Sequence, residues 1–277
     1  MCITVNHAKL SGTKILSLPL ENGNHFISYS NKAKNLSGKP NAMILPIPGE
    51  TNPSLFHDTT KYKDFMEEIT EKCELHGDYM GIRSRGMKGG DFLSFDKFEL
   101  GMYTVGLAKD FQGARDFLDS LPDEKRPEIS EELKKFFEEK YAGWYFAICC
   151  FSSDKAIDAQ PIAFEYRPFG ENLLYFPTMD GHNGKAPIID SVVKTDHTLI
   201  YEHTGKMNDI DYAQKFVTLD AAVPEFLQNR KYRAVFTRSV EKNGDTFVDL
   251  NKLKESEFRL DPEFKRVPPV PNVKQPA

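Results

Sequence analysis

The side chains best suited to acid–base or metal chemistry gather in one short stretch of the chain. They are Asp180, His182, Asp196, His197 and His203. Imidazole titrates near neutral pH and, together with carboxylates, binds divalent metals, so this group could carry either chemistry. The spacing matches no metal motif such as HExxH, and strand neighbours such as Asp196 and His197 face opposite sides. We therefore weigh a catalytic site against a structural role, in which His182 and His197 bond loop backbone and His203 is exposed. No metal and no cofactor is predicted.

A second chemical possibility is the cysteine at position 2, which opens a predicted strand. N-terminal nucleophile hydrolases place their catalytic thiol there, and the free α-amino group activates it once methionine is removed. Their layered α/β/β/α fold is one that the predicted elements could supply. The alternative function is therefore a hydrolase of amide bonds that acts through Cys2, with Arg83, Arg85 or a histidine from 182–203 nearby. A retained Met1 would block this chemistry.

Three basic side chains, Arg83, Arg85 and Lys88, lie in a glycine-rich segment between His76 and Asp91. Backbone N–H groups of such loops can bind anions. The segment matches neither GxxxxGK[ST] nor GxGxxG, and no clear strand–loop–helix pattern surrounds it. It is read either as a weak anion-binding loop or as a mobile surface loop.

The elements that must position these groups alternate between β-rich runs and helical patterns. Strands are predicted at residues 3–6, 13–18, 25–30, 42–49, 97–108, 143–151, 161–166, 173–177, 196–203, 232–240 and 246–249. Helices are predicted near 61–75, 110–121 and 130–141, and a shorter one near 219–228, mostly where apolar residues recur at helical spacing. The result is an α+β fold, with antiparallel sheets covered by three to four helices in a single large domain, residues 1–260.

Turn signals predict how these strands connect. The first three strands form a meander that contains a hairpin at Asn22-Gly23, and the strand at 42–49 lies at an edge or leaves the sheet at Pro46. Residues 167–170 join 161–166 to 173–177 as a hairpin, and 242–245 join 232–240 to 246–249 as another. The run at 143–151 is apolar throughout, so we expect a central strand buried on both faces.

Composition limits the class of partner. The 277 residues are 40 % hydrophobic and 28 % charged, with a net charge of −5, so no basic field for nucleic acid is expected. No stretch is long and apolar enough for a membrane span, and no secretion signal is recognised, which predicts a cytoplasmic protein or a particle assembled there. The four cysteines form no CxxC pair, and the adjacent Cys149 and Cys150 are expected to be small core residues.

The last residues, 261–277, contain five prolines and few apolar side chains. This composition predicts an extended arm without a packed core of its own. The residues expected to bind a partner there are Lys265, Arg266, Pro268, Pro269 and Pro271. Because the arm has too little apolar surface to offset the entropy of being fixed on its own domain, we expect other protein chains to bind it.

Parts of the sequence resemble known but uncharacterised proteins. The runs at 13–20, 41–49 and 159–166 resemble a bacterial domain of unknown function, and those at 174–182 and 195–201 are similar to uncharacterised proteins of bacteria, protists and large protist viruses. The likeness covers residues 2–203 in patches. It implies a shared fold and brings no known activity, so no catalytic residue is transferred. The bacterial members also look secreted and richer in N-terminal cysteines.

The sequence alone thus favours a non-enzymatic role. We predict a structural or protein–protein interaction component of a larger assembly, such as a viral particle, without nucleic-acid or membrane partners. The hydrolase that would act through Cys2 is the alternative.

Overall fold

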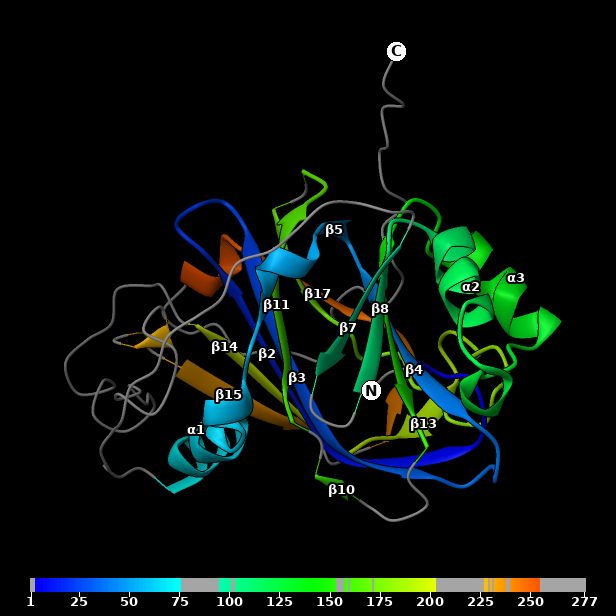
Figure 1. Cartoon of the computed structure of the whole chain (residues 1–277). Coiled ribbons are helices and arrows are strands. Elements are labelled where there is room, and N and C mark those ends of the chain that lie inside the picture. Colours follow the sequence, from blue (N-terminus) through cyan, green and yellow to red (C-terminus); the bar gives the residue numbers. More distant parts are fainter. Residues whose placement is uncertain are drawn as a thin grey trace.

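A computed structural model describes residues 3–75, 95–100, 103–152, 157–158, 160–170, 172–202, 227–228, 230, 232–237 and 240–254. The predicted α+β class is confirmed: β-sheets dominate, and helices pack on their outer faces (Figure 1). The predicted helix at 219–228 and the C-terminal arm lie outside the described residues, except for Leu227 and Gln228.

The first sheet has five strands in the order β1-β4-β9-β8-β7. Their bounds are Ile3–Thr4 for β1, Asn41–Ile47 for β4, Tyr145–Phe151 for β9, Tyr103–Ala108 for β8 and Phe95–Leu100 for β7. The predicted central strand is confirmed, because β9 lies between β4 and β8 and is buried from Phe146 to Phe151.

The second sheet has eight strands, six of them in the order β15-β14-β2-β3-β11-β5, while β10 pairs with β3 and β6 with β11. The bounds are Tyr232–Thr237 for β15, His197–Glu202 for β14, Ala8–Pro19 for β2, His25–Asn35 for β3, Ile162–Pro168 for β11, Gly49–Glu50 for β5, Ile157–Asp158 for β10 and Phe56–His57 for β6. The hairpin at Asn22-Gly23 is confirmed between β2 and β3, with Gly23 at φ 83°. Antiparallel pairing prevails among the described strands, but β14 and β2 run parallel.

Two small sheets complete the described part and correct both of the other predicted hairpins. β12 (Leu173–Phe176) pairs with β17 (Thr246–Asp249), and β13 (Val192–Lys194) pairs with β16 (Val240–Lys242). Residues 167–170 therefore turn the chain from β11 into a different sheet, and 242–245 do not join two neighbouring strands. A turn signal marks a reversal of the chain but does not specify which strand the next segment will pair with.

Other local expectations also needed correction. The N-terminal strands form no meander, because β1 pairs with β4 in the first sheet while β2 and β3 belong to the second. The predicted strand at 97–108 is a hairpin of β7 and β8, in which Leu100 pairs with Tyr103. β4 stays in its sheet through Pro46, since β1 pairs only with Met43 and Ile44 and the missing N–H of proline leaves no bond unmade on that side.

Helices cover opposite sides of the two sheets (Figure 1). The three predicted helices are confirmed as α1 (Phe65–Leu75), α2 (Phe111–Asp119) and α3 (Glu131–Lys140). Ser130 is the predicted N-cap of α3, with its hydroxyl accepting from Leu133 N at 3.3 Å, and Asp110 caps α2 in the same way.

Two apolar clusters hold these layers together. The larger one joins the inner faces of both sheets to α2 and α3, as in the stack of Phe111 on Phe137 and the contact of Phe56 with Phe98. The smaller one lies between α1 and the outer face of the second sheet, where Phe65 belongs to the same cluster as Leu16.

Candidate functional site

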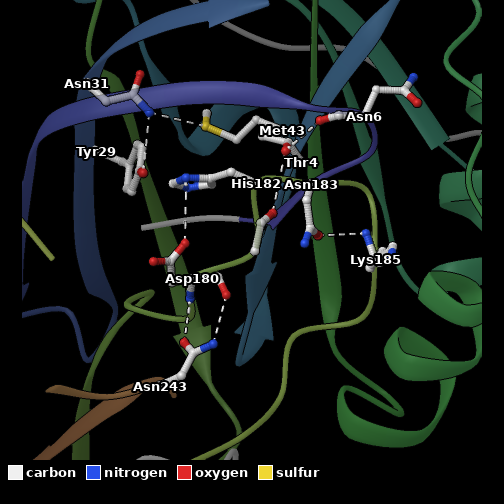
Figure 2. A network of polar contacts seen from close by, with 11 residues as sticks. Thr4, Asn6, Tyr29, Asn31, Met43, Asp180, His182, Asn183, Lys185 and Asn243 are labelled. Carbon is white, nitrogen blue, oxygen red and sulfur yellow. Dashed lines mark hydrogen bonds and ion pairs between the residues drawn. The ribbon is translucent and has the colours of Figure 1, made fainter. Parts of the chain in front are cut away.

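The loop at residues 178–184, which we call the junction loop, contains the first two predicted site residues, Asp180 and His182. It follows shortly after β12 and passes between the N-terminal strand, the segment that leads into β17 and the start of α3 (Figure 2). Because it belongs to no named strand along its length, its backbone groups need partners from other segments.

Asn243 supplies the first set of partners. Its side-chain amide accepts from Asp180 N at 2.7 Å and donates to Asp180 O at 2.8 Å (Figure 2). Its own backbone N–H donates to Ser191 O at 2.7 Å, and its carbonyl accepts from Asp190 N at 2.9 Å. One residue that is only 3 % exposed thus joins the junction loop, through its side chain, to the turn before β13, through its backbone.

The neighbouring Asp245 anchors the start of the loop. Its carboxylate accepts from Met179 N at 2.9 Å and from the Tyr141 hydroxyl at the end of α3 at 2.7 Å. Burial raises the pKa of the Asp245 carboxyl, and burial also raises the pKa of Tyr141 well above its ordinary value. Thr178 adds bonds of 2.8 Å to Gly244 O and to the Thr246 hydroxyl.

The far side of the junction loop pairs with the N-terminal segment. Thr4 N donates to Gly181 O at 2.8 Å, and Ala8 N donates to His182 O at 2.9 Å. At the end of the loop, the Ser130 hydroxyl donates to Gly184 O at 2.9 Å. Gly184 has φ 75°, and a Cβ there would lie 2.7 Å from Val5 O, so only glycine fits this close approach.

Asp180 and His182 lie next to each other, but the imidazole of His182 is a weak base. His182 Nδ1 lies 3.6 Å from Asp180 Oδ1, which is too long for a strong hydrogen bond. Burial raises the pKa of Asp180 and lowers the pKa of His182 to about 3, so the imidazole is neutral at pH 7. A base with so low a pKa removes protons poorly, which favours a structural role for this pair.

The remaining members of the predicted group are placed elsewhere. Asp196 is exposed, and its carboxylate accepts from Gly12 N in β2 at 2.8 Å. His197 is buried in β14, opposite Thr237 of β15, and His203 lies outside the described residues. Within the described ranges, no group of three or more His, Cys, Asp or Glu side chains is placed to hold a metal ion.

Several other predicted residues lie outside the described part of the chain. They are Cys2, Arg83, Arg85, Lys88, Lys265, Arg266, Pro268, Pro269 and Pro271. Ile3, which follows Cys2, pairs with Gly181 between Asp180 and His182. The two predicted core thiols are confirmed: Cys149 and Cys150 are buried, and burial raises the pKa of Cys150 to about 12. None of the helices in the described ranges has the length and apolarity to cross a bilayer.

A second polar cluster, which was not predicted from the sequence, surrounds Glu165 in β11. Its carboxylate lies 3.2 Å from His57 Nε2 and accepts from Asn24 at 3.0 Å and Asn22 at 3.3 Å. The bond from His57 is the largest cause that lowers the pKa of Glu165 to about 2. Three donors hold this carboxylate, so Glu165 fixes the turn between β2 and β3. In the sequence, the signal of this role is a single acidic residue within an apolar strand.

Comparisons with known proteins identify the fold. No protein-family model and no curated protein matches the chain. The crystal structure of baculovirus P35 aligns with a TM-score of 0.51 and 16 % identity, over 90 % of this chain and 99 % of that one. A mutated baculovirus P35 after caspase cleavage aligns at 0.47 and 14 %, over 87 % and 98 %, and the caspase-8/P35 complex at 0.41 and 15 %, over 87 % and 88 %. The first alignment shows a shared fold, while the resemblance to bacterial proteins stays a prediction.

We expect Asn243→Ala to destabilise the protein by about 2 kcal/mol, because the backbone N–H and C=O of Asp180 then lose their partners in a partly buried place. Urea denaturation measures this loss. Asn183→Ala is the matched control: its side chain is exposed and accepts from Lys185 N, so the cost of its removal should stay below about 1 kcal/mol. Equal losses in the two variants would contradict the role of Asn243.

Two buried histidines should make the protein less stable in acid. Burial lowers the pKa of His25 to about 4 and that of His182 to about 3, from an ordinary value of 6.5. Below pH 6.5 the unfolded chain therefore binds protons that the folded chain does not, and stability falls by about 1.4 kcal/mol per pH unit for each histidine. The buried acids Asp180 and Asp245 oppose this trend, but they are common to all variants.

Urea denaturation between pH 6.5 and 4.5 measures how steeply the free energy of unfolding changes with pH. This range lies above the pH at which the Glu165 carboxyl contributes most. His25→Phe should reduce this slope by the contribution of one proton, about 1.4 kcal/mol per pH unit. Lys125→Gln, a change at an exposed side chain, is the control. A slope that is the same in His25→Phe and the unsubstituted protein would show that His25 is not buried in its neutral form.

Proposed function

We propose that this chain binds other proteins and that its partner is a protease of the caspase class. The observation that carries the proposal is the fold shared with baculovirus P35 over nearly the full length of both chains. P35 has been solved after caspase cleavage and in complex with caspase-8. A fold alone does not determine function, so the proposal depends on the test that follows.

The test asks whether caspase-8 binds and cuts this chain. Caspases cut after aspartate, and the segment between α1 and β7 contains Asp78 and Asp91. We expect a complex on size exclusion and a cut after one of these residues, located by mass spectrometry. The double variant Asp78→Ala/Asp91→Ala should lose the cut. Asp123→Ala, at a side chain that is 92 % exposed, is the matched control and should be cut as before.

The same assay tests the predicted C-terminal arm. If Lys265, Arg266 and the prolines at 268, 269 and 271 carry partner binding, a 1–260 truncation should lose the complex. If the segment between α1 and β7 carries partner binding, the truncation should bind as the full chain does. The absence of both complex and cleavage with the full chain would defeat the caspase proposal. The proposed role in an assembled particle depends on partner binding by the C-terminal arm. Binding by the 1–260 truncation equal to that of the full chain would therefore contradict this role as well.

The hydrolase that acts through Cys2 stays the alternative, and one contact favours it. Ile3 pairs with Gly181, so the chain leaves the described part beside Asp180 and His182. The low pKa of His182 speaks against this imidazole as the base that activates a thiol. Intact mass decides the first condition: we expect Met1 to be removed if the alternative holds. A retained Met1, or amidase activity unchanged in Cys2→Ala, would end it.

A further inference from the structure

The segment that leads into β13 exposes two large apolar side chains. From Ile188 to Lys194 every second residue is exposed, and the residues between them are half-buried. Ile188 and Val192 are each 72 % exposed, whereas Leu36, the other exposed large apolar residue among those described, is 43 % exposed. Covering such side chains removes apolar surface from water, which is favourable. This segment is therefore a candidate for contact with another protein surface.

The outer edge of β13 can accept a further strand. Within the described part of the chain, β13 has β16 as its strand neighbour on one side and none on the other. Asn243 N donates to Ser191 O at 2.7 Å, and in an antiparallel ladder every second residue directs its N–H and C=O toward the same neighbour. Val193 therefore bonds to β16, while the N–H and C=O of Val192 point outward. An extended strand is the ligand that matches such an edge.

Opposite charges lie on the two sides of Val192. Asp190 is two residues before it and Lys194 two residues after it, and neither side chain forms an ion pair with a described residue. Asp190 has φ 61°, and its N–H donates to Asn243 O at 2.9 Å, which fixes the turn before β13. A lysine at a strand edge ordinarily repels an identical edge. Here an acidic residue at the same distance from Val192 offers that lysine a partner of opposite sign.

We propose that β13 pairs with β13 of a second copy of this chain, antiparallel about a two-fold axis at Val192. In this register the two Val192 residues lie opposite each other and exchange hydrogen bonds through their outward N–H and C=O groups. Each Asp190 then lies opposite Lys194 of the copy, so the charges are complementary. A shift of the copy by two residues in either direction would place Val192 opposite Asp190 or Lys194 and lose both contacts.

This dimer is weak and reversible. An edge of three residues buries much less than the roughly 1,600 Å² of a standard protein interface, so the dissociation constant should be on the order of 100 µM. The surface is separate from the segment between α1 and β7, and pairing of two copies requires no protease. The outcome of its test is therefore independent of the caspase test.

Sedimentation equilibrium of the full chain, at concentrations from about one-tenth to ten times that constant, tests the proposal. Val192→Lys should raise the dissociation constant about tenfold, because two ammonium groups then replace an apolar contact at the axis. Leu36→Lys, the same kind of change at an exposed apolar residue outside β13, is the matched control and should leave the constant within about twofold. A monomer at every concentration, or an equal effect of both substitutions, would overturn the proposal.

Cysteine crosslinking tests the register, and it decides the question even if Val192→Lys fails to fold. With copper phenanthroline as the oxidant, Val192→Cys should form a disulfide-linked dimer, because the two new thiols face each other across the axis. Ile188→Cys is the control of equal exposure, and its thiol should lie far from that of its copy in the antiparallel pair. The unsubstituted protein gives the background from its own four cysteines. Equal linkage of the two variants, or linkage of Val192→Cys no higher than this background, would contradict the proposed pairing.

Discussion

The backbone of the junction loop is the constraint on which the rest of the structure depends. Thr178, Met179 and Gly181 are buried and Asp180 is half-buried, so a backbone N–H or C=O left unpaired there costs about 1–3 kcal/mol. Here Asn243, Asp245, Thr4 and Ala8 supply the partners. These residues come from the two ends of the described chain, and Ser130 adds a bond to Gly184 O, so satisfying one loop brings the N-terminal segment, the segment before β17 and the start of α3 together.

Much of the local structure could be predicted from the sequence, because its signals are local. The apolar run of β9, the helical spacing of α1 and the capping Ser130 of α3 each determine their element through neighbours in sequence. Strand partners were predicted less well. β12 pairs with β17 and β1 with β4 across long stretches of chain, and these choices follow from which apolar faces fit in the core. A turn residue contains no information on that fit.

The same difference between local and distant contacts explains which parts of the candidate site could be predicted. Asp180 and His182 are two residues apart in one loop, and their contact was accessible to sequence reasoning. Asp196 and His197 separate from them because β14 pairs in parallel with β2, which orients Asp196 toward Gly12. Asn243 was read as a turn residue and Glu165 as an ordinary strand residue, since their partners come from distant segments. Amide and carboxylate groups acquire such roles only from tertiary neighbours.

The interior and the surface place different demands on charge. In the interior, burial lowers the pKa of His25 and His182 and raises that of Asp180 and Asp245, so it favours the neutral form of each of these four groups. On the outer face of β2 and β3, which water reaches, Lys9 lies opposite Lys34, and the repulsion between the two costs stability. Charge is thus placed where water can solvate it, while the described interior contains groups whose neutral forms burial favours.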